Sequence, residues 1–317
     1  MARNQIQFQK GLSEIEFQRQ YGTDEQCIEA LSKLRWPDGF RCPACGHDAA
    51  HKLHCRPLMQ CRRCRTQTSV TADTIFHSTK LSLTVWFRGI YLLTQSKNGV
   101  SALELMRRLG TTYNTAWMMK QKLMQVMKER DGTKRLGDRV EIDDAYIGGE
   151  RERKPGTAGR GAEGKTPFIA AVQTDLGGRP KSIALFKVDG FTSSEVAKFA
   201  QQKLTPDADV VTDGLACFAA VMEQGCSHSF VVTGGGRQSM ESSTFRWVNT
   251  ALGNIKSALI GTYRHVSPQH VPRYLAEFQY RFNRRYDLAG MLTRLSHSAV
   301  RTPPMPYRLL KLAESAA

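Results

Sequence analysis

Four cysteines in two close pairs are the first residues of this sequence whose types and spacing could do chemistry. Cys42 and Cys45 are separated by two residues, as are Cys61 and Cys64, and 15 residues lie between the pairs. Zn²⁺ prefers soft thiolate ligands at the corners of a tetrahedron, and a two-residue spacer lets both sulfurs of a pair face one point. We therefore expect all four to hold a structural Zn²⁺ ion. The segment around them is short and polar, so the metal would have to stabilise it.

Two aspartates and an asparagine could form a second metal site of a different kind. Residues 139–147 alternate like a strand with Asp143 on one side, and residues 209–212 predict a short buried strand that presents Asp213 at its end. Asn249 and Lys256 are two turns apart on a predicted helix and so share a face. Mg²⁺ (or Mn²⁺) prefers such oxygen ligands, and two ions about 4 Å apart can drive phosphoryl transfer. In that arrangement Asp143 bridges both ions.

Other residues compete for these roles. Asp144 could be the ligand in place of Asp143, although alternation puts it on the opposite face of the strand. Asp213 precedes Gly214 and could be a turn residue. Glu241 could take the place of Asn249. The residues alone leave these alternatives open, because short acidic patterns recur by chance.

The charge of the chain predicts a polyanionic partner. Its formal net charge is +16 and its sequence pI is about 9.7, which favours nucleic acid or an anionic membrane. The most apolar stretch, residues 85–93, is interrupted by Arg88 and is too short to span a bilayer. The polar N-terminus has no apolar core of a signal peptide. We therefore expect a cytoplasmic protein that binds double-stranded DNA and no membrane.

A helical segment in front of the aspartates has a pattern typical of DNA-binding domains. Helices are predicted over residues 12–35, 81–96, 101–109 and 113–129. Ser101 and Glu104 form a capping box, and Gly110 ends the third helix before a short turn. Helix, turn and helix is the arrangement that places a recognition helix in a major groove; the alternative is a plain three-helix bundle. The residues expected to face DNA are Tyr113, Asn114 and Lys120, together with Arg62, Arg63 and Arg65 beside the second cysteine pair.

These segments predict three domains. Residues 1–75 would hold a first helix and the cysteine pairs, residues 76–132 the helix-turn-helix-like segment, and residues 133–317 the domain with the aspartates. In that last domain short β-branched runs alternate with helical patterns, followed by helix over residues 245–285. Residues 150–165 are rich in glycine and basic residues, which predicts a surface loop between two strands.

The phrases around these residues resemble a known family. The chain is similar to bacterial insertion-sequence transposases that join an N-terminal zinc ribbon to a DDE-type, RNase H-like core. The phrases that carry the resemblance are Val140–Gly149, Val211–Gly214, Trp247–Lys256, Gly261–Val266, Tyr274–Phe278 and Tyr280–Arg285. The resemblance covers roughly residues 20–310, and it implies an α/β core, a mixed sheet flanked by helices.

The resemblance also implies roles for individual residues. Asp143 and Asp213 would be the first two metal ligands, and Lys256 would contact DNA phosphate. The third acid of such cores is usually glutamate, whereas this chain has Asn249, which coordinates Mg²⁺ without charge and cannot act as a base. The arginines that follow the helix of Asn249 would face outward to DNA, namely Arg273, Arg281, Arg284 and Arg285.

The implied activity is metal-dependent cleavage at transposon ends followed by strand transfer into target DNA. Because such a reaction joins two ends, a homodimer or a higher oligomer is expected on the DNA. Two other readings stay open. The chain could be a DNA-binding protein that has lost catalysis, with Asn249 marking the loss, or a structure-selective DNA nuclease on the same fold.

Overall fold

The computed structural model describes residues 8–53, 57–148, 165–232, 243–263 and 266–312. The chain forms two compact units, one from residues 1–129 with 285–312 and the other from residues 130–284. The three-domain division stays a prediction. Glu241 and the segment 150–164 lie outside the described residues. Within the described ranges no helix combines the length and the apolar character that a membrane span requires.

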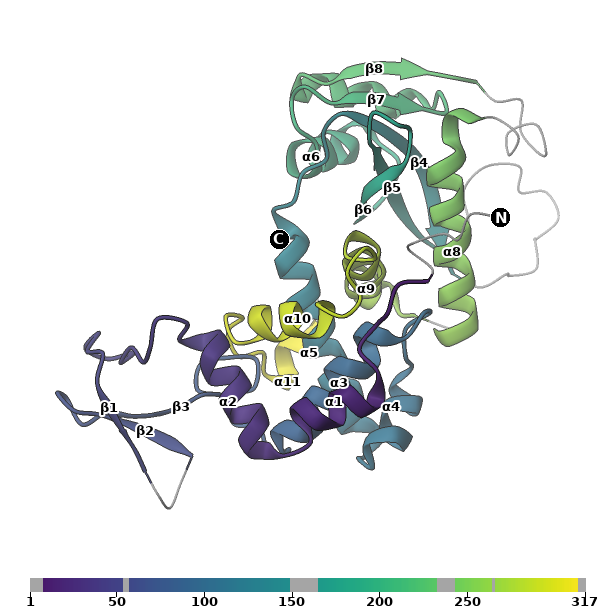
Figure 1. The fold of residues 1–317 in the computed structure, drawn as a ribbon. Helices are drawn as coiled ribbons and strands as arrows, with labels where there is room; N and C mark the ends of the chain where they lie inside the picture. The colour runs from purple at the N-terminus through teal and green to yellow at the C-terminus, as the bar shows by residue number, and fades with distance from the viewer. Residues whose placement is uncertain (1–7, 54–56, 149–164, 233–242, 264–265, 313–317) are drawn as a thin grey trace. The chain divides into compact units, whose positions relative to one another are not determined.

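Helices make up most of the first unit (Figure 1). They are α1 (Glu14–Tyr21), α2 (Asp24–Arg35), α3 (Leu83–Gln95), α4 (Ala102–Leu109), the greater part of α5 (Tyr113–Gly132), α10 (Met291–Ala299) and α11 (Tyr307–Leu312). The predicted ends of α4 are confirmed: Ser101 Oγ accepts from the Glu104 amide at 3.1 Å, and Gly110 ends the helix at a φ of 63°. The N-cap of α2 is Thr23, while Asp24 accepts from the Thr84 amide at 2.9 Å at the start of α3.

A small antiparallel sheet in the same unit carries the cysteine pairs. Its order is β1 (Ala50–Lys52), β2 (Leu58–Cys61) and β3 (Gln67–Ser69). Among its described residues from 40 to 69, the buried side chains are those of Cys42, Cys61 and Thr68. The described residues of this segment therefore form no apolar core beyond the cysteines, as the sequence predicts.

The second unit is built on a mixed five-stranded sheet with the order β6-β5-β4-β7-β8. The strands are β4 (Arg139–Ile147), β5 (Thr166–Thr174), β6 (Pro180–Lys187), β7 (Asp209–Thr212) and β8 (Ser227–Phe230). The first three pair antiparallel, whereas β7 runs parallel to β4, and β8 parallel to β7. The predicted bounds of the β4 strand, residues 139–147, are confirmed.

Helices cover the two faces of this sheet. Val140, Ile142 and Val210 pack in one core with α6 (Ser193–Lys203) and the 3₁₀ helix η1 (Ala216–Gln224). Ala145 and Val211 pack in the other core with α8 (Arg246–Tyr263) and α9 (Val271–Asn283). Short 3₁₀ turns, η2 (Ser243–Phe245) and η3 (Pro268–His270), precede α8 and α9. The odd-numbered residues of β4 thus face α8. Figure 1 shows β4 and α8 next to each other.

Candidate functional site

The four predicted zinc ligands lie together in the small sheet of the first unit. Cys42 Sγ is 3.5 Å from Cys64 Sγ, Cys45 Sγ is 3.6 Å from Cys61 Sγ, and all four sulfurs lie within 4.8 Å of one another. A disulfide would need about 2.05 Å between sulfurs. Four thiolates 2.3 Å from a tetrahedral zinc ion would be about 3.8 Å apart. The cluster therefore fits Zn²⁺ by donor type and by spacing.

The pKa of the Cys64 thiol is lower than that of an ordinary cysteine. Hydrogen bonds from the Thr66 side chain and backbone lower its pKa to about 6, and Cys64 Sγ lies 3.2 Å from Thr66 Oγ1. Only the thiolate form binds a metal, so Cys64 can serve as a ligand at neutral pH, whereas the pKa of Cys45 is raised without the metal to about 12.

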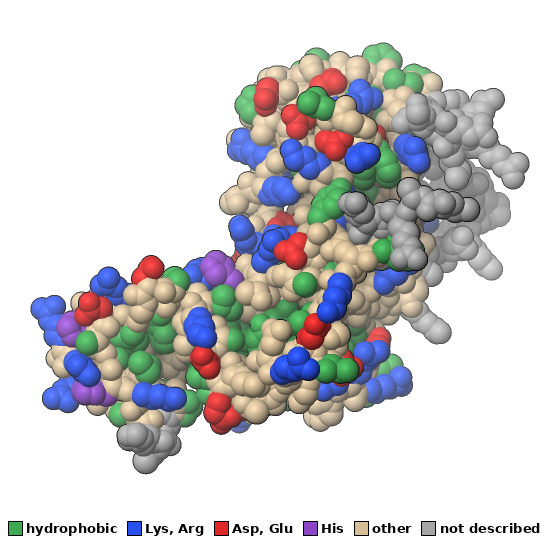
Figure 2. All heavy atoms as spheres, viewed as in Figure 1, with side chains coloured by type: hydrophobic (Ala, Val, Ile, Leu, Met, Phe, Trp, Pro, Cys, Tyr) green, Lys and Arg blue, Asp and Glu red, His purple; other side chains and the backbone are tan. Residues whose placement is uncertain are grey.

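Basic side chains surround the second cysteine pair. Arg62, Arg63 and Arg65 are exposed, and Figure 2 shows lysine, arginine and histidine side chains over the part of the molecule that Figure 1 labels β1 to β3. Contact of these arginines with phosphate stays a prediction. Such a contact requires exposed side chains, and all three side chains are exposed.

In the second unit, the pairing of β4 with β7 brings the two predicted aspartates, Asp143 and Asp213, side by side. Parallel pairing joins Val140 to Val210 and Glu141 to Val211, and beyond the last pair carboxylate oxygens of Asp143 and Asp213 lie within 4.8 Å of each other. Asp213 directly follows the carboxyl end of β7, where α/β sheets present their ligands, whereas Asp143 lies in the middle of β4, just beyond its pairing with β7. Gly214 has a φ of 90° and turns the chain directly after Asp213.

Asp144 joins this pair, against the expectation from alternation. Single carboxylate oxygens of Asp143, Asp144 and Asp213 lie within 4.8 Å of one another. The prediction that Asp144 points away was wrong. Pairing of β4 with β7 ends at Glu141, so no strand separates the Asp144 side chain from Asp213. Among the described residues, the site thus holds three carboxylates.

Burial and the two neighbouring carboxylates make Asp143 a weaker acid than an ordinary aspartate. Burial raises the pKa of Asp143 to about 7, Asp144 and Asp213 add to the rise, and Lys256 opposes it. A cation at this place would relieve both the burial and the repulsion. The oxygen ligands of an octahedral Mg²⁺ ion lie about 3–4 Å apart, close to the spacing found here. The three carboxylates therefore fit a hard divalent cation such as Mg²⁺ or Mn²⁺.

Helix α8 brings Asn249 and Lys256 to the same face of the sheet. Its apolar stripe, Val248, Ala251, Leu252 and Ile255, is buried against the sheet, while Asn249 is partly buried and Lys256 is exposed. Burial is the main cause that raises the pKa of Asp143, and the positive charge of Lys256 acts in the opposite direction.

A contact that the sequence analysis missed fixes the start of α8. Glu141 Oε2 accepts from the backbone amides of Trp247 and Val248, each at 3.0 Å. Burial raises the pKa of Glu141, and the two amides act in the opposite direction. One signal was available: Glu141 lies two residues before Asp143, so alternation puts both acids on one face.

One of the side chains predicted to face DNA, that of Lys120, is buried. Tyr113 and Asn114 are exposed at the start of α5, as expected. Lys120, however, is 1% exposed, and its Nζ donates to the Val100 carbonyl at 2.6 Å. The prediction that Lys120 faces outward was wrong, because α5 is buried on several sides and its polar residues do not mark a single outer face.

Two of the arginines after α8, Arg281 and Arg284, do not face outward either. The side chain of Arg281 is 11% exposed and lies 3.8 Å from Glu277, and that of Arg284 is 13% exposed and binds Asp131 at 2.7 Å. Arg285 is partly buried. The outward orientation predicted for Arg281 and Arg284 was wrong.

The cause is the packing of α9. The Gln279 side chain accepts from the Leu185 amide of β6 at 2.9 Å, and Asn283 Oδ1 accepts from the Ile183 amide at 2.8 Å. Arg273 on the same helix is 1% exposed. The polar residues of α9 are therefore interior partners of the sheet and of one another, and the helix has no simple outer face.

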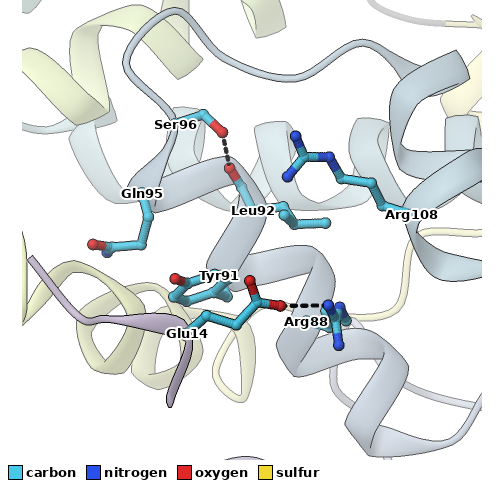
Figure 3. A pocket seen from close by; sticks show the side chains of 7 residues that line it. All are labelled: Glu14, Arg88, Tyr91, Leu92, Gln95, Ser96 and Arg108. Carbon is cyan, nitrogen blue, oxygen red and sulfur yellow. Dashed lines mark hydrogen bonds and ion pairs between the residues drawn. The ribbon is translucent and has the colours of Figure 1, made fainter. Parts of the chain in front are cut away.

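The first unit also contains a pocket, shown in Figure 3. Residues of α3 line it together with Glu14 and Arg108. Its two arginines are already paired: Arg88 binds Glu14 at 2.6 Å, and Arg108 binds Glu104 at 2.8 Å. We assign this pocket no role in chemistry.

The strand order, the aspartates that meet on neighbouring parallel strands and the helix laid across them define an RNase H-like core of the DDE type. Residues 135–283 match the ISXO2-like transposase domain, and residues 22–67 match the transposase zinc-ribbon domain. The chain therefore belongs to the insertion-sequence transposases that combine these two domains. No curated protein matches the chain.

Proposed function

We propose that this transposase cuts DNA at the ends of its insertion sequence and joins the freed ends to target DNA, using Asp143, Asp213 and Asn249 as metal ligands. The observation that carries the proposal is the meeting of Asp143 and Asp213 on the face of the sheet that α8 covers. Donors of this kind are what a phosphoryl-transfer site needs.

Each side chain has a distinct part in the proposal. Asp143 and Asp213 bind Mg²⁺ (or Mn²⁺) through carboxylate oxygens, and Asn249 binds through its amide oxygen without adding charge. When bound, the ion stabilises negative charge on the phosphate oxygens during an in-line displacement. Lys256 holds a DNA phosphate beside the carboxylates. Asn249 has no basic oxygen for proton abstraction, so the proton of the attacking group leaves to solvent or to another acceptor.

Two displacements follow from the same site. Water attacks a phosphodiester at the transposon end, and the broken bond leaves a 3′-hydroxyl. That hydroxyl then attacks a phosphodiester of the target, forming one bond and releasing one 3′-oxygen. Joining two ends requires two active sites, so we propose that the protein acts as a homodimer or a higher oligomer on double-stranded DNA.

The zinc ribbon and the helix-turn-helix-like segment hold the DNA in this proposal. Arg62, Arg63 and Arg65 would contact phosphate, and Tyr113 and Asn114 would approach the bases. All five are exposed.

A strand-transfer reaction tests the proposal. Purified protein, labelled end DNA and a supercoiled target plasmid are incubated with and without Mg²⁺. We expect Mg²⁺-dependent end cleavage and labelled plasmid. Cutting of branched DNA without joined product would favour the structure-selective nuclease, and end binding without any cutting would favour a DNA-binding protein that has lost catalysis.

A further inference from the structure

Glu141 is a buried carboxylate in the middle of the catalytic sheet. It is 3% exposed, and its Oε2 atom accepts from two consecutive backbone amides of α8, those of Trp247 and Val248. Burying a carboxylate in a sheet is costly unless its charge is satisfied. The positive end of a helix, with amides that lack partners within the helix, satisfies it well.

This cap comes from far away in the sequence. Helices are usually capped by the residue just before them, whereas Glu141 and Trp247 are 106 residues apart. The contact is therefore a tie between strand β4 and helix α8, in addition to a cap for the helix.

The two ends of this tie adjoin the proposed metal ligands. Glu141 lies two residues before Asp143 on the same face of β4, a rise of about 7 Å. Asn249 directly follows Val248, one of the two amides bound by Glu141. Asp143 and Asn249 are thus connected through a short strand segment, one side chain and a single step along the helix.

An asparagine ligand makes such a tie more important than a glutamate ligand would. A glutamate at position 249 would be drawn toward a cation by its own charge. The neutral amide oxygen of Asn249 is attracted only weakly, so its position has to be set by the protein beforehand.

We propose that Glu141 is a positioning residue that holds the start of α8 on β4 and so keeps Asn249 in register with Asp143 and Asp213. Glu141 touches neither DNA nor metal in this role. The inference rests on the proposed metal site, and its test is chosen so that the two can fail separately.

Iron-directed cleavage of the protein backbone tests it. Fe²⁺ placed at the Mg²⁺ site of the full-length, zinc-loaded protein, with ascorbate and peroxide, produces radicals that cut the chain close to the ion. In the wild type we expect cuts near residues 143, 213 and 249. In Glu141→Ala we expect the cuts near 249 to be lost and those near 143 and 213 to remain. Glu141→Gln, which keeps an acceptor oxygen without the charge, should retain weaker cuts near 249.

Thr192→Ala is the matched control. Thr192 caps α6 in the same unit, its hydroxyl accepting from the Glu195 amide at 3.3 Å. Its loss removes a helix cap without touching α8, so the full cutting pattern should persist. End cleavage should fall about 100-fold in Glu141→Ala, with the affinity for end DNA unchanged.

The outcomes separate the two claims. Equal cutting near residue 249 in wild type and Glu141→Ala overturns the positioning role while leaving the metal site intact. A wild type without cuts near 143 and 213 overturns the proposed metal site itself. If Glu141→Ala does not fold, the Gln variant decides: unchanged cuts near 249 and unchanged end cleavage would contradict the inference.

Discussion

Asp143→Asn should reduce Mg²⁺-dependent end cleavage on the order of a thousandfold or more, and it should also make the metal-free core more stable. The loss follows because a ligand that stabilises the transition state by several kcal/mol is removed. The gain in stability follows because, without metal, the Asp143 carboxylate is unfavourable in the folded protein: burial, Asp144 and Asp213 raise its pKa to about 7.

The gain in stability of Asp143→Asn should depend on pH. In the unfolded chain Asp143 has an ordinary pKa of about 3.9. Above that pH, Asp143 has lost its proton in the unfolded chain but keeps it in the folded chain. The free energy of unfolding of the wild type therefore falls as the pH rises to about 7. The melting temperature of Asp143→Asn should therefore exceed that of wild type by several degrees at pH 8, and the difference should vanish near pH 4.

Thermal unfolding of zinc-loaded protein without Mg²⁺ measures this difference. Asp209→Asn is the control, because Asp209 lies at the other end of β7, is exposed, and pairs with Ser227 at 3.2 Å. It should cut end DNA within about twofold of wild type, as surface substitutions usually leave function intact. A destabilised Asp143→Asn protein at pH 8, or one with wild-type cleavage, would contradict the assignment of Asp143.

Removal of zinc should unfold the ribbon and abolish binding to end DNA. Between residues 40 and 69 the described buried side chains are two cysteines and one threonine. Metal binding therefore has to supply the folding free energy, which for structural zinc sites is on the order of 10 kcal/mol. Cys61→Ser, which replaces a fully buried ligand, should have the same effect as chelation.

Zinc analysis, limited proteolysis and DNA binding measure the outcome together. The wild type should contain one zinc per chain and resist proteolysis between residues 40 and 70, whereas Cys61→Ser should lose both properties. Cys226→Ser is the control, since Cys226 is buried in the other unit and contacts the Thr205 carbonyl at 3.3 Å. Freshly purified wild type without bound metal would refute the zinc ribbon.

Local patterns were sufficient to predict much of the fold and of the site. The strand pattern over residues 139–147 predicted β4, and the rule that α/β sheets present ligands at the carboxyl ends of strands predicted the place of Asp213 after β7. The spacing of the cysteine pairs predicted their cluster. These features depend on residues close in sequence or on general rules of sheets.

The errors concern side chains whose surroundings come from distant segments. Asp144 turns toward Asp213 because pairing of β4 with β7 ends early, which no local pattern shows. Lys120 and Arg284 are long basic residues that look exposed in a sequence, yet they bind Val100 and Asp131 from other elements. The same applies to the tie from Glu141 to α8.

The central claim is that Asn249 works as a metal ligand in an active enzyme. The most direct measurement is Mg²⁺- or Mn²⁺-dependent cleavage of labelled end DNA by wild type, Asn249→Ala and Asn249→Glu. We predict that the wild type cuts, that the Ala variant loses cleavage while still binding DNA, and that the Glu variant does not exceed the wild type, because it adds a carboxylate to a site that already holds three. An inactive wild type that gains cleavage as Asn249→Glu would contradict the account and would identify this chain as a DNA-binding protein that has lost its chemistry.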